Sequence, residues 1–366
     1  MPRIAPLVED RAGWTGAELA TSGDWIRELD PAQCDEIAGA AANLRRRGLR
    51  FPAFTRADFP LPRTAPLLAA ISDELENGRG AVRLRNLDVR RFSDDELRQV
   101  FWGIGLHLGT PLFQNARGEA MGEVRDESLL AEKTYEKVEP GKVASSRSRT
   151  RGTGPLRWHT DRCDVIALLC ARNARAGGVS KLASIVTIYR EIARRRPDLL
   201  ELLCQDYWRS RPKDEDGSGV ERALALPVFS VLDGRLTSQY SRTYVEQAQE
   251  FAEVPRLSKA QDEALDLLAA VAEETCLHCP FETGDIQLLN NHVIYHGRTA
   301  YQDDADAGQD RLLLRLWLAT PNSRRLPAGH EVLWGSTEPG TVRGGVVQPG
   351  TGARAVTGQS NRGDRA

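Results

Sequence analysis

The chain has 366 residues and a formal net charge of −2 at pH 7, with 41% hydrophobic and 27% charged residues. These values are typical of a soluble globular protein, and the near-neutral balance favours neither nucleic acid nor an anionic membrane surface as a partner. No apolar run reaches the roughly 18 residues of a membrane span, and no secretory hydrophobic segment follows Met1. The sequence therefore predicts a cytoplasmic protein with neither nucleic-acid nor membrane partners.

The first third of the chain predicts helices around one short strand. Asp30 as N-cap and Pro31 at the first position open a helix that continues to Gly48. Residues 65–77 form a second amphipathic pattern and residues 81–84 a short strand. A capping-box pattern at 93–96 begins a third helix.

Residues 114–155 are the least patterned part of the chain, rich in Gly, Glu, Lys, Ser and Arg. A long loop inside a compact domain is usually functional or mobile. Because it leads directly into Trp158 and His159, we expect either a lid over a site or a plain solvated loop.

The middle of the chain predicts strands, then helices, then a hairpin. Residues 164–171 are continuously apolar, as in a strand buried on both faces. Asp233-Gly234 between apolar runs at 224–232 and 236–240 is a strong hairpin signal. The other expected elements are a strand at 179–183, helices at 186–196, 198–207, 244–251 and 258–276, a charged loop at 213–221, and strands at 286–289 and 311–319.

These elements together predict a single α+β domain around a β-barrel core. We expect the domain to span residues 1–353, with a helical part at about 30–110 and the core at about 80–320. Residues 354–366 are expected to form a disordered tail.

Candidate metal ligands lie in two distant segments. His159 and Asp161 are two residues apart, so in an extended strand both side chains point to the same face. A third ligand could come from His292 or His296, and the β-branched neighbours of these residues argue against a helix carrying both. Two His and one carboxylate with open positions are the ligand set of non-heme Fe(II) oxygenases.

Arg311 and Arg315 lie four residues apart in the apolar run at 311–319. Burying arginine is costly unless it is paired. The two arginines could form structural ion pairs, for example between Arg315 and Asp164, or could bind carboxylates of small molecules beside the metal.

Cys276 and Cys279 have the spacing of a zinc knuckle, but no second pair follows at a fitting distance. Either a structural zinc site or two ordinary thiols is compatible with this pattern.

Several motifs in order resemble the taurine dioxygenase/clavaminate synthase group of Fe(II)- and 2-oxoglutarate-dependent oxygenases. The resemblance implies a double-stranded β-helix, or jelly-roll, core with flanking helices, and it implies Fe(II), 2-oxoglutarate and O2 as cofactors. The matching pieces are GAVRLR at 80–85, FWGIGLHLGTP at 101–111, WHTD at 158–161, GGVS at 177–180, GDI at 284–286, and the stretch 290–317.

The same resemblance assigns roles to individual residues. It places the distal ligand before a small residue and an arginine, which matches His296 better than His292. It implies that Arg311 holds the distal carboxylate of 2-oxoglutarate and that Ser180, or its rival Ser184, assists. Arg315 would meet the substrate.

The implied function is oxidation, by default hydroxylation, of an unactivated C–H bond in a small carboxylate or amino-acid-like substrate, with release of succinate and CO2. Alternatives are a desaturase or cyclase with the same cofactors, a metal-dependent hydrolase with the same ligands, or a catalytically silent binding protein. The partner is expected to be a small molecule, and a homo-oligomer is left open.

Overall fold

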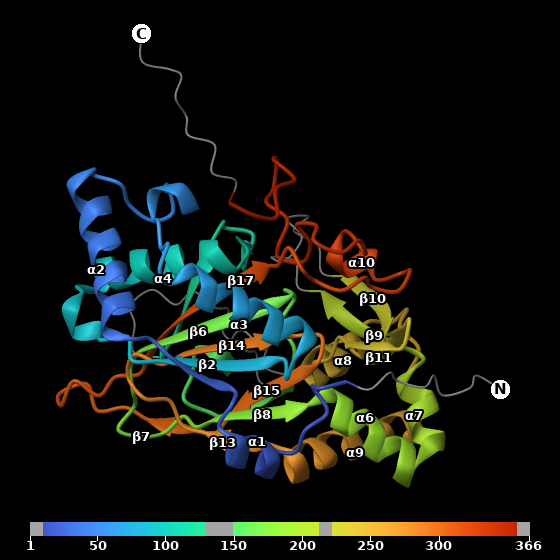
Figure 1. The fold of residues 1–366 in the computed structure, drawn as a ribbon. Helices are drawn as coiled ribbons and strands as arrows, with labels where there is room; N and C mark the ends of the chain where they lie inside the picture. Colours follow the sequence, from blue (N-terminus) through green and yellow to red (C-terminus); the bar gives the residue numbers. More distant parts are fainter. Residues whose placement is uncertain (1–9, 129–148, 212–221, 357–366) are drawn as a thin grey trace.

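The structure is a computed structural model that describes residues 10–128, 149–211 and 222–356. A larger and a smaller sheet lie one above the other, with α2, α3 and α4 on the outer side of the larger sheet (Figure 1). The larger sheet has the order β1-β2-β14-β6-β17-β3, with β4 also paired to β17. Its strands are β1 (Ile26–Glu28), β2 (Ala81–Arg85), β3 (Thr110–Pro111), β4 (Met121–Val124), β6 (Val165–Arg172), β14 (Ile286–Asn290) and β17 (Leu312–Ala319).

The smaller sheet has the order β13-β8-β15-β5. Three two-stranded sheets complete the β-structure: β9 with β10, β11 with β12, and β7 with β16. The strands of these four sheets are β5 (Leu156–His159), β7 (Ala176–Gly177), β8 (Ser180–Ser184), β9 (Asp206–Arg211), β10 (Arg222–Pro227), β11 (Phe229–Leu232), β12 (Arg235–Ser238), β13 (Leu277–Cys279), β15 (Ile294–Arg298) and β16 (Tyr301–Gln302).

Six helices cover the two outer faces of this arrangement (Figure 1). Those on the larger sheet are α2 (Pro31–Arg46), α3 (Ala65–Asn77) and α4 (Asp94–Leu108), and those near the smaller sheet are α6 (Ile185–Arg195), α7 (Pro197–Leu203) and α9 (Lys259–Thr275). Shorter elements are α1 (Gly16–Ser22), α8 (Arg242–Ala248), α10 (Glu331–Trp334), and the 3₁₀ turns η1 (Arg56–Asp58) and η2 (Val89–Arg91). No described helix combines the length and apolar character that crossing a bilayer requires.

Strand β6 shows how the two layers share one core. Ala167 and Leu169 belong to the apolar cluster of α2, α3 and α4, whereas Ile166 and Leu168 belong to the cluster on the opposite face. Side chains that alternate between two buried faces produce a continuous apolar run. The prediction of a strand buried on both faces is therefore confirmed.

The predicted helix starts are also confirmed. Asp30 and Gln33 form a reciprocal capping box at the start of α2, and Ser93 and Glu96 form one at α4. The predicted hairpin exists as β11–β12, with Asp233 at φ 53° and Gly234 at φ 74°. Two successive residues of positive φ match the twist of a tight hairpin.

Three expectations about local structure are wrong. The helix expected at 198–207 ends at Leu203, because Asp206 begins β9 and pairs with Pro227 of β10. The run at 224–232 is two strands with different partners, β10 and β11. The stretch 114–155 contains a strand, β4, that pairs with β17. In all three segments, pairing with a distant strand outweighs the local secondary-structure propensity.

Parts of three other expectations lie outside the described residues. The possible lid includes residues 129–148, the charged loop at 213–221 falls within 212–221, and the tail includes 357–366.

Candidate active site

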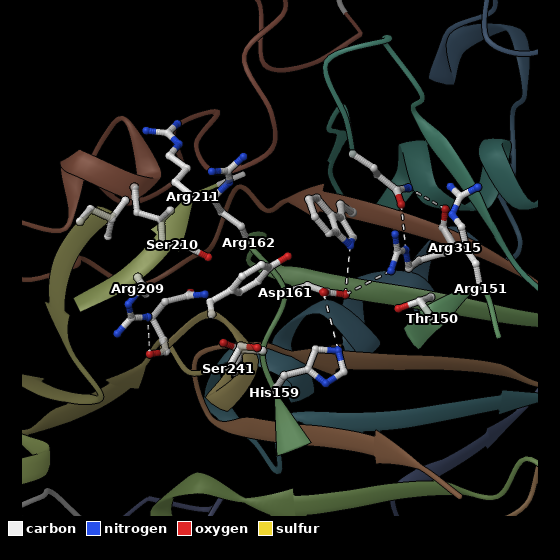
Figure 2. Close-up of a pocket in the computed structure, with 17 residues that line it drawn as sticks. Thr150, Arg151, His159, Asp161, Arg162, Arg209, Ser210, Arg211, Ser241 and Arg315 are labelled. Carbon is white, nitrogen blue, oxygen red and sulfur yellow. Dashed lines mark hydrogen bonds and ion pairs between the residues drawn. The ribbon is translucent and has the colours of Figure 1, made fainter. Parts of the chain in front are cut away.

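His159, Asp161 and His296 come together between the two sheets. Each residue offers one potential ligand atom, and these atoms all lie within 4.8 Å of one another. Nε2 of His159 is 3.9 Å from Oδ1 of Asp161, and Nε2 of His296 is 3.8 Å from Oδ2. Figure 2 shows His159 and Asp161 pointing toward each other. The structure thus joins the two distant segments that the sequence singled out.

Strand pairing places the two imidazoles next to each other, and a hydrogen bond orients that of His159. His159 ends β5 and lies directly opposite His296 of β15, with ring centroids 4.2 Å apart. Nδ1 of His159 donates to the carbonyl oxygen of Arg157 at 2.8 Å, which leaves Nε2 with a free lone pair. Burial and the neighbouring His159 lower the pKa of His296 to about 3, so its ring is neutral and can also bind a metal.

Asp161 is held from two sides. Its backbone N–H donates to Oδ1 of Asn291 at 3.0 Å, and its Oδ2 accepts from Nε1 of Trp317 at 3.1 Å. Burial alone would raise the pKa of Asp161, but the charge of Arg315 and the Trp317 hydrogen bond keep it below its ordinary value. The carboxylate is therefore ionised and fixed in direction.

This donor set fits a divalent transition metal. Two imidazoles and one carboxylate suit Fe(II), and a three-residue set leaves the remaining coordination positions for other ligands. Nδ1 of His296 is enclosed and makes no hydrogen bond to a described residue, so strand pairing alone positions this residue.

Trp317→Phe is expected to lower the affinity for Fe(II) about tenfold, because the substitution removes the N–H that fixes Oδ2 of Asp161 and keeps most of the ring. Anaerobic titration with Fe(II) measures the change. Trp102→Phe is the matched control, since Nε1 of the buried Trp102 makes no hydrogen bond to any residue that the structure describes. Equal Fe(II) affinity in Trp317→Phe and Trp102→Phe would show that the indole N–H has no part in holding the metal.

Two lobes of the pocket meet at His159 and Asp161, and His296 lines one of them. The Arg311 lobe has an empty volume of about 450 Å³ and is lined by, among others, Ser180, His296, Arg298 and Arg311. The Gln239 lobe has an empty volume of about 870 Å³, and its lining includes Gln114, Arg209, Gln239 and Tyr244. Thr150, His159, Asp161 and Arg315 line both lobes.

Arg311 is a buried cation that faces the first lobe. Its side chain is 3% exposed, stacks over the Tyr301 ring at 5.5 Å and makes no hydrogen bond to a described residue. Arg298 lies over the same ring at 4.6 Å, and burial and the charge of Arg311 lower its pKa to about 10. Two adjacent guanidinium groups without a described carboxylate partner make this lobe suitable for an anion.

The two candidate serines lie in different environments. Ser180 lines the Arg311 lobe, and its Oγ accepts from Nε2 of Gln287 at 3.0 Å. Ser184 caps α6, where its Oγ accepts from the Thr187 N–H at 3.0 Å and donates to the carbonyl of Ala12. The position of Ser180 is therefore the one compatible with a ligand in this lobe.

Arg315 lies between the metal-binding candidates and the Gln239 lobe. Its Nη1 is 3.9 Å from Oδ2 of Asp161, and its Nε donates to Oε1 of Gln114 at 2.8 Å. The alternative ion pair between Arg315 and Asp164 does not occur. Asp164 instead receives Nη2 of Arg343 at 2.8 Å.

His292 has a structural environment. Its Nε2 donates to Oδ1 of Asp164 at 2.9 Å, and its Nδ1 accepts from the Thr237 hydroxyl at 2.7 Å. Burial lowers its pKa to about 4. Both ring nitrogens are occupied, so His292 is not available to the metal.

The zinc knuckle is not formed. Cys279 is buried and directs its thiol to the carbonyl oxygen of Ser180, whereas Cys276 lies with His278 and Glu273 at the surface. Glu273 is also bound to Lys181 at 2.6 Å. The two cysteines therefore behave as separate thiols.

Sequence reasoning missed Gln114, Asn291, Trp317 and Gln239. Trp317 follows Arg315 by two residues, so strand alternation could have placed it on the same face. Asn291 is part of the NNH segment at 290–292. Gln114 and Gln239 carry no local signal, because only the folded chain brings them to the pocket.

The chain is similar to known oxygenases. Residues 46–317 match the family model described as "Taurine catabolism dioxygenase TauD, TfdA family". FR-33289 synthase of Streptomyces rubellomurinus (strain ATCC 31215) is 31% identical over 328 residues, which cover 87% of this chain and 92% of that protein.

Two solved structures share the fold. An asparagine oxygenase in complex with Fe(II), 2S,3S-3-hydroxyasparagine and succinate has a TM-score of 0.61 and 19% identity, covering 81% of this chain and 94% of that one. The non-heme iron oxygenase OrfP in complex with Fe and alpha-ketoglutaric acid has a TM-score of 0.58 and 16% identity, covering 87% and 99%. Because the family match spans most of the chain and includes His159, Asp161 and His296, the chain belongs to the TauD/TfdA family of Fe(II)- and 2-oxoglutarate-dependent oxygenases, enzymes that use Fe(II), 2-oxoglutarate and O2.

Proposed function

We propose that this enzyme hydroxylates an unactivated C–H bond of a small carboxylate or amino-acid-like substrate, and that it converts 2-oxoglutarate to succinate and CO2. One observation carries the proposal: two lobes meet at His159 and Asp161, His296 lines one of them, and arginines line each lobe. Two anionic reactants could thus reach one metal from two directions. We also propose that the two stacked sheets form a double-stranded β-helix.

In this proposal His159, Asp161 and His296 hold Fe(II). Arg311 binds the distal carboxylate of 2-oxoglutarate with help from Ser180, since both line the Arg311 lobe. Bound Fe(II) with 2-oxoglutarate and O2 supplies the oxidising chemistry. The protein orients the reactants and limits the access of water, because the three metal-binding side chains are at most 12% exposed.

Arg315 is the proposed substrate-binding residue. Gln114 fixes its Nε, so the two terminal nitrogens are directed at the pocket and at Asp161. A bound metal would neutralise Asp161 and leave the guanidinium to the substrate's carboxylate or sulfonate. Asparagine and arginine derivatives are the molecules named with the two solved relatives, which agrees with an amino-acid-like substrate.

The proposal is tested by measuring succinate release with Fe(II), 2-oxoglutarate, ascorbate and a panel of amino acids, sulfonates and aryloxy acids. At least one acid is expected to stimulate release well above the uncoupled background. Turnover of a substrate without 2-oxoglutarate would instead indicate a metal-dependent hydrolase. Product analysis separates hydroxylation from desaturation or cyclisation.

Arg315→Gln is expected to raise the KM for the substrate by at least about tenfold, because a charged hydrogen bond of about 1.5–3 kcal/mol is lost. The KM for 2-oxoglutarate should stay within about twofold, since Arg311 holds that molecule. Both constants come from the same succinate assay. Equal activity of the wild type on a substrate and its neutral amide at the Arg315 end would contradict the assignment.

A further inference from the structure

The Gln239 lobe contains a side-chain amide without a partner. Gln239 follows β12 and is 8% exposed. Its backbone N–H donates to Val228 at 3.3 Å and its carbonyl accepts from Arg209 at 2.7 Å, so the main chain is fixed. The side-chain amide makes no hydrogen bond to any described residue, and its Oε1 is enclosed. A buried polar group left unpaired is costly, which points to a ligand as its partner.

Arg209 gives this end of the pocket a positive charge. It is 5% exposed, and its Nη1 and Nη2 donate to the backbone carbonyls of Gln239 and Leu226 at 2.7 and 2.9 Å. No described carboxylate pairs with its guanidinium. Burial lowers the pKa of Arg209 to about 10, so it stays protonated at neutral pH. In Figure 2 Arg209 and Arg315 lie at opposite ends of the pocket.

Resting on the proposed function, we propose that Gln239 selects a substrate with an uncharged amide at the end opposite the anion held by Arg315. An amide side chain offers an NH2 donor group and a carbonyl acceptor side by side. Only a ligand group that also offers both a donor and an acceptor can pair with the oxygen and the nitrogen of the Gln239 amide at once. This holds for either orientation of that amide. The nearby Arg209 charge disfavours an ammonium or guanidinium tail at this end.

Each simpler group leaves part of the site unsatisfied. A carboxylate is attracted by Arg209 and can accept from the Gln239 N–H, but it leaves the enclosed Oε1 facing a second acceptor without a donor. An alkyl end leaves both atoms unpaired. Sites built to hydrogen-bond a polar group reject analogues that lack it far more strongly than apolar pockets reject a missing methylene. The substrate class is therefore an acid with a neutral carboxamide at its far end.

The test uses four five-carbon acids that share one carboxylate and differ at the other end: 5-amino-5-oxopentanoate, 5-aminopentanoate, glutarate and pentanoate. Binding is read anaerobically from the change each acid causes in the absorption band of the Fe(II)–2-oxoglutarate complex, at saturating 2-oxoglutarate. The amide is expected to bind at least tenfold more tightly than pentanoate, and the ammonium compound most weakly. This readout needs no turnover.

Two variants examine the residue itself. Gln239→Leu is expected to abolish the difference between the amide and pentanoate. Gln239→Glu keeps the shape and adds a negative charge, so it is expected to weaken the amide and improve 5-aminopentanoate at least tenfold. Gln249→Glu is the matched control, because Gln249 lies outside the pocket and its Oε1 accepts from Leu257 N–H at 3.0 Å.

The outcomes separate this inference from the proposed function. If the wild type forms no Fe(II)–2-oxoglutarate complex, the proposed function is wrong and this inference fails with it. A normal complex that shows no preference for the amide, or binds none of the four acids, overturns the role of Gln239 alone. If Gln239→Glu binds the four acids in the same order of affinity as the wild type, the role of Gln239 is likewise overturned.

Discussion

Asp161→Ala should leave a folded protein that retains no Fe(II) after desalting and loses more than about a hundredfold of its succinate release. Asp161 is the only anionic group of the three converging residues. Loss of a direct ligand should exceed the 10- to 100-fold effects typical of residues that only support ligands. Iron analysis and the succinate assay measure the two losses, and circular dichroism checks the fold.

His292→Ala is the control for the ligand assignment. Its ring nitrogens are bound to Thr237 and Asp164, so the variant should retain iron even though it leaves two buried groups unpaired and lowers stability. Activity of Asp161→Ala within a few fold of the wild type, or loss of iron from a folded His292→Ala, would contradict the proposed triad.

Arg311→Lys should weaken the apparent affinity for 2-oxoglutarate by about tenfold to a hundredfold, the scale of one lost charged hydrogen bond of about 1.5–3 kcal/mol. Lysine keeps the charge but loses both the fork and the planar group that stacks over Tyr301 at 5.5 Å. Titration with 2-oxoglutarate under anaerobic conditions measures the affinity directly.

Arg315→Lys is the control for Arg311→Lys, since Arg315 is proposed to bind the substrate and not 2-oxoglutarate. Its 2-oxoglutarate titration should match that of the wild type within about twofold. An unchanged titration in Arg311→Lys would assign the distal carboxylate to another group, and Arg298 is the neighbouring guanidinium over the same ring.

The sequence predicts elements well where local signals decide the structure. The capping boxes of α2 and α4 and the turn at Asp233-Gly234 need only neighbouring residues, and all three occur as expected. The sequence-based prediction is wrong at β9, because a segment whose residues suit a helix pairs with β10 instead. A short stretch of sequence does not reveal the stabilisation that comes from pairing with a distant strand.

The candidate site divides in the same way. The pair of His159 and Asp161 is visible from spacing alone, because strand geometry fixes which side chains share a face. Gln114, by contrast, reaches Arg315 across 201 residues of sequence. Gln239 stands out because its side-chain amide has no hydrogen-bond partner among the described residues. Such an unpaired amide cannot be recognised until the surrounding hydrogen bonds are known.

The buried contact between Arg343 and Asp164 sets a time at which the metal site can be completed. The two residues are 179 positions apart, and at about 5–20 residues per second roughly 10–40 s of synthesis separate them. For most of that interval the segment that carries His159 and Asp161 exists without Trp317, which holds one carboxylate oxygen, and for all of it without the arginine that anchors Asp164. If the proposed ligands hold the metal, the site with all of these supporting contacts exists only in molecules whose translation has passed Arg343.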